Sequence, residues 1–368
     1  MSKSPTVYDV AARAGVSTAT VSRVLRRSAD VSAVMRDKVM SAVRDLGYVP
    51  SASARGLAAR KTGVLGLYFP GFDAVEEIDD TIATTDAGVE VVDDRGTLGD
   101  VRPPNLYFDE LLRGSELEAR RRGFALMVGV SGGMSPEEMV SDLAGRVDGL
   151  AVLAQSVPLD LLEHVSRRIP VVLIAGPRRD DDFDHVSVSN TEGMRALTEH
   201  LIVRHGADAP VYLAGPADSP DDSERYEGFV QALEAHGIDP GVSPILRAGF
   251  SRVRARSVAE HLVRSGTIPR VLVCGNDQMA LGVLDVFEQH GISVPGDVIV
   301  TGFDGIDASR QSSPRLTTVE QPMMELGRTA IRTVLSRLEQ PNHEPITVRL
   351  PVRVVLRESS EGSARVPA

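Results

Sequence analysis

The chain has 368 residues, of which 42% are apolar and 25% are charged, a composition typical of a globular protein with two or three domains. No stretch approaches the apolar length of a membrane span, and Asp9 and Arg13 interrupt the apolar residues near the start, where an export signal would lie. The single cysteine, Cys274, excludes an intrachain disulfide framework and agrees with a reducing compartment. We therefore expect a cytoplasmic protein with no membrane partner.

Charge is distributed unevenly along the chain. Residues 1–63 contain eleven Lys and Arg residues and four acidic residues, a net charge of +7, and the whole chain carries −11, which leaves −18 for the remainder. A basic head on an acidic body favours binding of nucleic-acid phosphates by the head alone.

The first 48 residues predict three short helices. Thr6 is a candidate N-cap for the first helix, and Ser17 is a candidate cap for a second helix from Thr18 to about Leu25. A third helix, capped by Ser32, is expected to run to about Leu46. Two short helices joined by a glycine-containing turn are typical of a helix-turn-helix, although other three-helix domains share this pattern.

The segment DVAARAGVSTATVSRVL, followed by VSAVMRDKVMSAVRDLGYVPSASARGLAARKTG, resembles the head and hinge of the LacI/GalR family of ligand-responsive transcription regulators. The resemblance continues almost to the C-terminus. It implies a helix-turn-helix DNA-binding domain over residues 1–49, a hinge helix or linker over residues 50–63, operator DNA as a partner, and a homodimer.

The resemblance also implies which side chains contact DNA. Thr18, Ala19 and Arg23 occupy the positions that contact bases in the major groove, and an arginine that bonds a guanine twice discriminates by about 1–3 kcal/mol. Phosphate contacts, which set the register without reading the sequence, are expected from Tyr8, Ser17, Thr20 and Ser22. The chain departs from the family at Arg26-Arg27, where an asparagine is frequent, and the two arginines add charge there.

The hinge segment has two interpretations. Residues 50–63 contain good helix formers, but the segment is short and Gly56 costs about 1 kcal/mol relative to alanine, so it should be unfolded in isolation. By composition alone a flexible linker is the simpler interpretation. The resemblance instead implies a helix that folds on operator DNA, with Ala54, Arg55 and Leu57 in the minor groove and Leu57 wedged into a base step.

From Val64 onward, short apolar runs alternate with amphipathic segments, which predicts parallel α/β sheets. The pattern occurs twice and resembles the type I periplasmic-binding-protein core. The expected fold is thus an N-terminal all-α helix-turn-helix head plus an α/β core of two parallel-sheet lobes. The expected N-terminal lobe comprises residues 64–188 and 322–340, and the C-terminal lobe residues 189–321 and 341–360, with crossings near Val188, Gln321 and Gln340.

Sheets of this kind bind ligands beyond the carboxyl ends of their strands, where polar side chains occur in this sequence. By the resemblance, the effector site comprises Tyr107, Phe108, Asn190, Arg225, Phe250, Asn276, Asp304 and Gln321. Carboxylate, amide and guanidinium groups suit the hydroxyls of a polyol, so the expected effector is a sugar or a sugar derivative. Each residue could instead be a helix cap, a turn residue or a core filler, and Asp277 is the clearest candidate cap.

Two positions depart from the family pattern of the effector site. Ala175-Gly176 stands where an acidic residue is frequent, and Ser189-Asn190 stands where an Asp-Asn pair is frequent. The chain also has no tryptophan and only 4% aromatic residues, which leaves the identity of the sugar open.

Residues 73–104 form an acidic insertion with no counterpart in a typical first lobe. Ten acidic residues and one arginine lie between Asp73 and Asp100, which favours a solvated loop. The alternatives are a lid or partner-docking loop, or an acidic segment that competes with DNA for the basic heads.

The sequence motifs that would indicate an enzyme or a cation site are weaker. Gly129 to Gly133 matches G-x-S-x-G around Ser131, but no Asp and His pair follows at strand ends, so we expect no catalytic residue and no enzyme. Asp180 to Asp182 is more simply a solvated charge run than a cation site, and we expect no metal and no cofactor. The polar tail, residues 361–368, lacks leucine heptads, which favours a dimer over a tetramer. The expected function is a homodimeric regulator, most simply a repressor; the alternative is a ligand-insensitive DNA-binding or architectural protein.

Overall fold

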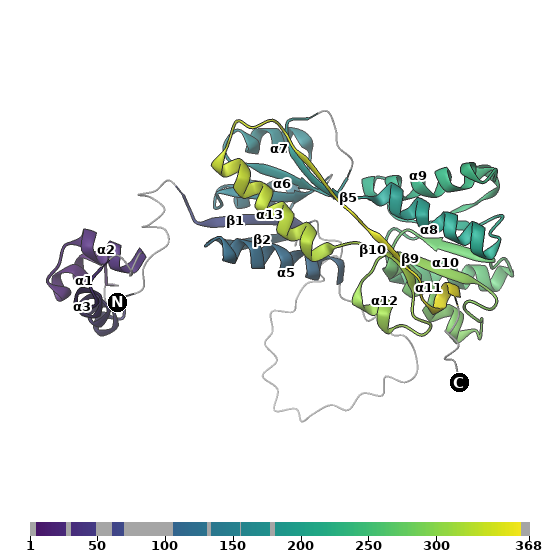
Figure 1. Cartoon of the computed structure of the whole chain (residues 1–368), viewed down its shortest axis with the longest axis horizontal. Helices are drawn as coiled ribbons and strands as arrows, with labels where there is room; N and C mark the ends of the chain where they lie inside the picture. The colour runs from purple at the N-terminus through teal and green to yellow at the C-terminus, as the bar shows by residue number, and fades with distance from the viewer. Residues whose placement is uncertain are drawn as a thin grey trace, which may run out of the picture. The chain divides into compact units, whose positions relative to one another are not determined.

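The computed structural model describes residues 5–26, 31–48, 61–69, 106–130, 134–154, 156–176 and 181–361. The chain divides into two compact units, residues 1–63 and residues 64–368, which we call the head and the core (Figure 1). Several predicted features lie outside the described residues: Arg27, the hinge residues Ala54, Arg55 and Leu57, the acidic insertion 73–104, Ser131, Asp180 and residues 362–368 of the tail.

The head contains the three predicted helices, α1 (Val7–Ala14), α2 (Thr18–Arg26) and α3 (Ala33–Leu46). Thr6 caps α1 in a reciprocal capping box with Asp9, and the Ser17 hydroxyl accepts the Thr20 amide at 3.2 Å at the start of α2. The three helices share one buried core: Val10, Ala11, Ala14, Val21, Val24, Val39 and Ala42. The turn between α1 and α2 contains Gly15 in the left-handed conformation, which ends α1 and is frequent in the turn of a helix-turn-helix.

The first lobe of the core contains a parallel sheet with strand order β11-β5-β4-β3-β1-β2. Its strands are β1 (Val64–Phe69), β2 (Ala125–Val130), β3 (Gly149–Leu153), β4 (Val171–Ile174), β5 (Asp184–Val188) and β11 (Thr347–Leu350). Its helices are α5 (Leu106–Arg121), α6 (Pro136–Ala144), α7 (Leu159–Ser166) and α13 (Met323–Glu339).

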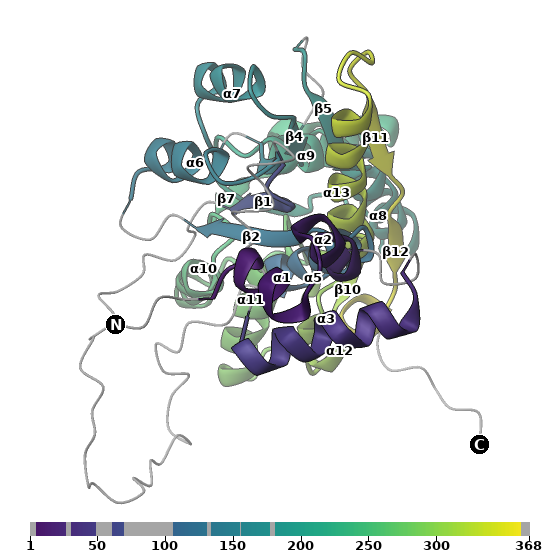
Figure 2. The same ribbon diagram turned by 90° about the vertical axis from the view of Figure 1, so that its left-hand side faces the viewer.

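The side chains of β1 point alternately to the two faces of this sheet, and both faces are buried. Leu65 and Leu67 belong to the core cluster formed with α5 and α13, whereas Tyr68 belongs to the cluster formed with α6 and α7. Figure 2 shows α6 and α7 on one side of the sheet and α13 on the other. Burial on both faces explains why the strands read as continuous apolar runs.

The second lobe has a sheet with strand order β12-β10-β9-β8-β6-β7, parallel except for β12, which is antiparallel to β10. Its strands are β6 (Val211–Ala214), β7 (Ile245–Arg247), β8 (Val271–Cys274), β9 (Ile299–Asp304), β10 (Thr317–Glu320) and β12 (Arg353–Val355). Its helices are α8 (Asn190–His205), α9 (Pro220–Ala235), the 3-10 helix η2 (Pro240–Val242), α10 (Arg252–Ser265), α11 (Asp277–Gln289), α12 (Asp307–Gln311) and α14 (Glu358–Glu361). One core cluster joins the sheet to α8 and α9, and another joins it to α10 and α11.

Three connections pass between the lobes (Figure 1). The first runs from β5 to α8, and the second runs from β10 to α13, which packs on the first sheet. The prediction that the third lies near Gln340 was wrong, because β11 still pairs with β5 in the first sheet and only β12 joins the second. The third connection therefore lies at residues 351–352, and residues 347–350 belong to the first lobe.

Glycines allow α5 and α13 to cross closely. A Cβ atom on Gly114 would overlap the carbonyl oxygen of Met324, and one on Gly327 would overlap that of Leu111. Gly114→Ala should therefore lower the free energy of unfolding by about 1–3 kcal/mol, because backbone rather than a mobile side chain must move. Urea unfolding measures this loss, and Arg113→Ala, on the exposed side of α5, should change stability by less than about 0.5 kcal/mol. Equal stability of the two variants would contradict the close crossing.

Candidate DNA-contacting surface and effector site

The predicted base-contacting residues lie on the outward side of α2. Val21 and Val24 are buried and fix the rotation of this helix against α1 and α3. That rotation leaves Ala19 and Arg23, one turn apart, exposed, with Thr18 half-buried beside them. The side chain of Arg23 is thus available to a base edge.

Three of the predicted phosphate-contacting residues, Ser17, Thr20 and Ser22, lie at or next to the start of the same helix, and Tyr8 lies on α1. Tyr8 is 73% exposed on α1, so its hydroxyl is free to reach a phosphate. Ser17 is exposed, and its hydroxyl lies 2.9 Å from that of Thr20. Ser22 is half-buried one turn after Thr18. These assignments of DNA contacts stay predictions.

In the core, the predicted effector residues gather around Arg225 of α9, whose guanidinium group is buried. Its Nε donates to Asn190 Oδ1 at 2.9 Å, and its Nη1 donates to the carbonyl oxygen of Gly275 at 2.7 Å. The same Nη1 lies 3.4 Å from Asp304 Oδ1, and the guanidinium stacks 3.9 Å from the centroid of the Phe303 ring. We call the group of Asn190, Asp221, Arg225, Asp304 and Gln321 the Arg225 cluster.

Asp221 connects this cluster to the first lobe. Asn190 Nδ2 donates to Asp221 Oδ1 and to Glu224 Oε2, both at 3.0 Å. The same Asp221 oxygen accepts the backbone N–H of Gly176, which follows β4 of the first lobe, at 3.1 Å. The sequence predictions missed Asp221, whose only signal was its place in the first turn of a helix. Ala175-Gly176 stands where the family pattern frequently has an acidic residue, and in this chain the second lobe supplies the carboxylate that bonds Gly176.

Asp304 and Gln321 complete the cluster. Gln321 Nε2 donates to Asp304 Oδ1 at 2.7 Å, and both side chains are buried. Asp304 has a φ of 120°, a strained conformation for a residue with a side chain, which is characteristic of ligand-binding positions. Gln321 Oε1 is buried and has no hydrogen-bond partner among the described residues. It is therefore an acceptor ready for a hydroxyl donor.

The N-cap of α11 is Asn276 rather than Asp277. Asn276 Oδ1 accepts the Met279 amide at 2.9 Å, whereas Asp277 is fully buried. Asp277 accepts the backbone N–H groups of Gly305 and Ile306 at 2.8 and 3.0 Å and the Thr318 hydroxyl at 2.6 Å. It thus fixes the loop that follows Asp304. The role of Asn276 in effector binding stays a prediction, since its side-chain oxygen is used in the cap.

Burial raises the pKa of Asp277, and the neighbouring Asp304 raises it further. The groups that donate hydrogen bonds to Asp277 oppose this shift. A carboxyl group whose pKa is raised on folding binds more protons in the folded chain than in the unfolded chain. It therefore destabilises the fold as the pH rises above the pKa that the group has in the unfolded chain. The stability of the wild-type chain relative to Asp277→Asn should therefore fall as pH rises from about 5 to about 8. Urea unfolding across this pH range measures the free energy of unfolding of both variants, with Asp208→Asn as the exposed control. A difference in this free energy between wild type and Asp277→Asn that stays constant with pH would contradict the prediction.

Of the three predicted aromatic residues, two lie against the Arg225 cluster. Tyr107 packs on the core clusters of both lobes, and burial followed by the charges of Asp221 and Asp304 raises the pKa of its hydroxyl. The Phe250 ring centroid lies 5.7 Å from the Arg225 guanidinium carbon. Phe108 packs on Phe69 of the first lobe, with ring centroids 4.6 Å apart.

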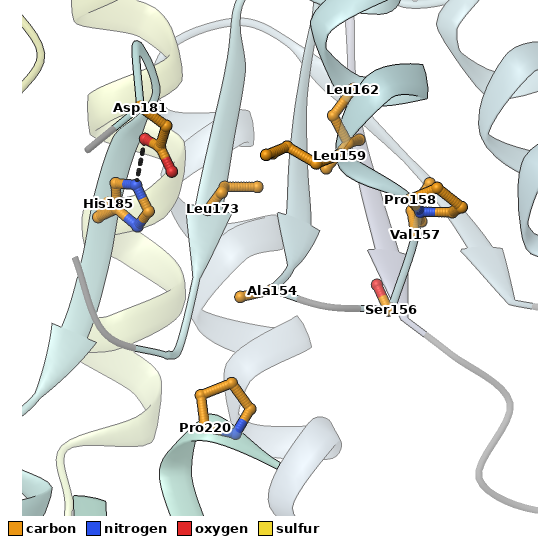
Figure 3. A pocket seen from close by; sticks show the side chains of 10 residues that line it. All are labelled: Ala154, Ser156, Val157, Pro158, Leu159, Leu162, Leu173, Asp181, His185 and Pro220. Atoms are coloured by element: carbon orange, nitrogen blue, oxygen red, sulfur yellow. Dashed lines mark hydrogen bonds and ion pairs between the residues drawn. The ribbon is translucent and has the colours of Figure 1, made fainter. Parts of the chain in front are cut away.

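A cavity of about 350 Å³ lies beside the loops at the carboxyl ends of β3 and β4 (Figure 3). No predicted effector residue lines it; its walls are Ala154, Ser156, Val157, Pro158, Leu159, Leu162, Leu173, Asp181, His185 and Pro220. Figure 3 shows Asp181 and His185 facing each other at one side, where their Oδ1 and Nε2 atoms are 2.8 Å apart. Among the described residues, Pro220, next to Asp221, is the one that the second lobe contributes to its walls. Nothing in the residue pattern pointed to this cavity.

Two family models match the chain. The model described as "Bacterial regulatory proteins, lacI family" matches residues 6–51, and the "Periplasmic binding protein-like domain" matches residues 198–360. The HTH-type transcriptional repressor PurR of Photobacterium profundum is 30% identical over 359 residues, which are 96% of this chain and 98% of that protein. The catabolite control protein A of Priestia megaterium is 27% identical over 97% of this chain and 99% of that protein.

Solved structures match over the same length. The transcriptional regulator CelR in complex with cellobiose is 26% identical, with a TM-score of 0.65 over 97% of this chain and all of that chain. The lac repressor dimer bound to operator and the anti-inducer ONPF is 24% identical, with a TM-score of 0.77 over 97% of this chain and 99% of that chain, and shares the fold. Within the described ranges, no helix is long and apolar enough to cross a membrane. The chain belongs to the LacI/GalR family of DNA-binding transcriptional regulators, with repressors among its full-length relatives, and is not an enzyme.

Proposed function

We propose that this chain is a homodimeric repressor that binds a palindromic operator and is controlled by a sugar or sugar derivative bound at the Arg225 cluster. The observation that carries the proposal is the position of this cluster, where Asp221 of the second lobe bonds Gly176 of the first. A ligand that competes with this bond between Asp221 and Gly176 changes the contact between the two lobes. Closure of two lobes around a ligand transmits binding through such a change.

The DNA-binding part of the proposal rests on the head. Two copies of α2 would enter successive major grooves, with Arg23 donating to a guanine and Thr18 and Ala19 beside it. Tyr8, Ser17, Thr20 and Ser22 would bond phosphates and hold the register. In the hinge, we propose that Ala54, Arg55 and Leu57 occupy the minor groove of the operator, with Leu57 between base pairs.

The effector part rests on the chemistry of the Arg225 cluster. A sugar hydroxyl can donate to Asp304 or to Gln321 Oε1 while it accepts from the Arg225 guanidinium. Tyr107 and Phe250 supply apolar walls for the ring carbons, and Phe108, Asn190 and Asn276 complete the proposed set. The regulator CelR, which matches 97% of this chain and whose structure is a complex with cellobiose, supports a sugar. A full switch between DNA-bound and free states needs about a 10⁴-fold difference in affinity between the two conformations.

A panel of mono- and disaccharides tests the effector assignment by thermal unfolding of the full-length chain. A true effector at 100 times its Kd should stabilise the folded chain by about 2.7 kcal/mol. No stabilisation by any sugar in the panel would favour the alternative, a DNA-binding or architectural protein that responds to no ligand. Stabilisation that persists in Asp304→Asn would place the sugar elsewhere in the core.

A further inference from the structure

A cluster of two histidines and a glutamate lies in the second lobe, among residues not assigned to the Arg225 cluster. His200 and His205 stand near the carboxyl end of α8, and Glu361 ends α14. Nε2 of His200 lies 3.0 Å and Nε2 of His205 lies 2.9 Å from the same carboxylate oxygen, Oε1 of Glu361. The two imidazole rings are inclined by 69°, with centroids 5.8 Å apart. All three potential ligand atoms lie within 4.8 Å of one another.

The chain holds these three side chains on fixed backbone. Ser359 Oγ donates to the Val300 carbonyl at 2.6 Å and accepts the Thr317 amide at 2.8 Å, and the Ser360 hydroxyl lies 2.7 Å from Thr317 Oγ1. Both serines are buried, so α14 is bonded to β9 and β10 directly before Glu361. On the opposite side, the buried face of α8 packs on the second sheet through Met194, Leu197 and Leu201. The donors are therefore brought together by the fold and not by mobile loops.

The arrangement has the chemistry of a zinc site. Zinc binds histidine nitrogen and carboxylate oxygen at about 2.0–2.2 Å, and tetrahedral bonds of this length place ligand atoms about 3.4 Å apart. The observed separations from Glu361 Oε1, 3.0 and 2.9 Å, are within a few tenths of an ångström of that spacing. The three side chains are between 18 and 29% exposed, which leaves a path for the ion.

We propose that His200, His205 and Glu361 bind one Zn²⁺ ion per chain through the two Nε2 atoms and a carboxylate oxygen. Solvent water occupies the remaining position of the tetrahedron. The ion joins α14 to α8, two elements that are far apart in the sequence, and so stabilises the second lobe. This site is independent of the Arg225 cluster and of the effector that we propose there.

The test is isothermal titration of ZnCl₂ into the full-length chain, prepared without a histidine tag and freed of metal by dialysis against a chelator. We expect one zinc ion per chain at neutral pH. His205→Gln and Glu361→Gln should each weaken zinc binding by more than about 100-fold, beyond the 10–100-fold loss typical of an outer-shell partner. His261→Gln, which changes an exposed histidine on α10, is the matched control and should bind zinc like the wild type.

Thermal unfolding gives a second readout of the same site. Zinc should raise the thermal unfolding midpoint of the wild type and of His261→Gln, but not that of the two site variants, whose folds are checked by circular dichroism. The proposal is overturned if the wild type takes up no zinc, or if the site variants, folded as the wild type, bind it with unchanged affinity.

Discussion

Asp304→Asn should abolish the response of operator binding to the sugar effector, while operator affinity without the effector stays within about twofold of the wild type. The substitution keeps the size of the side chain but removes the charge that lies 3.4 Å from Arg225. It also replaces one acceptor oxygen by a donor, so a ligand hydroxyl loses its partner and an unpaired polar group remains buried, at a cost of about 1–3 kcal/mol. Operator binding measured with and without the effector found in the panel gives the response.

Asp208→Asn is the matched control for this experiment. Asp208 lies exposed between α8 and β6 of the same lobe, so its replacement removes the same charge away from the Arg225 cluster. The control variant should respond to the effector like the wild type. An unchanged response in Asp304→Asn would remove Asp304 from the effector site.

Arg23→Ala should relax sequence preference at one base pair of each operator half-site. A bidentate arginine–guanine contact discriminates by about 1–3 kcal/mol, which corresponds to about a 5- to 150-fold loss of preference at that position. Binding to a set of operators substituted at each base pair measures this loss. The physical reason is that Arg23 is exposed on the outward side of α2, which Val21 and Val24 hold in place.

Arg13→Ala separates the loss of a base contact from the loss of positive charge. Arg13 is also exposed in the head and pairs with Asp45 at 3.5 Å. Its removal should weaken binding to all sequences similarly, because a phosphate contact or a diffuse charge carries no sequence preference. Equal losses of preference in the two variants would contradict the assignment of Arg23 to a base.

The parts of the fold that were predictable from the sequence depend on local signals. Capping residues such as Thr6, Ser17 and Ser32 define the helices of the head, because their hydroxyls accept amides three residues later. Continuous apolar runs, whose side chains are buried on both faces of a sheet, are the local signal for the strands of the core. The effector residues that gather around Arg225 were named through the family motifs and not through any local pattern.

The features that were missed depend on contacts between distant segments. The short strand β11 has an alternating, half-exposed pattern that suits either sheet, and only its pairing with β5 assigns it to the first lobe. Asn276 and Asp277 are adjacent and both can cap a helix, so the sequence does not show that Asp277 is instead buried against β10. The partners of Asp221 and Glu361 likewise come from segments that only the tertiary fold brings together.

The most direct test of the proposed function is selection of duplexes from a random pool by the purified full-length chain at physiological salt. A dimer with two α2 helices should enrich a palindrome whose half-sites lie about one helical turn apart. The palindrome would then be the probe for the effector and for the Arg23 and Asp304 variants. Salt-sensitive binding with no enriched sequence, in the presence of every sugar of the panel, would contradict the account.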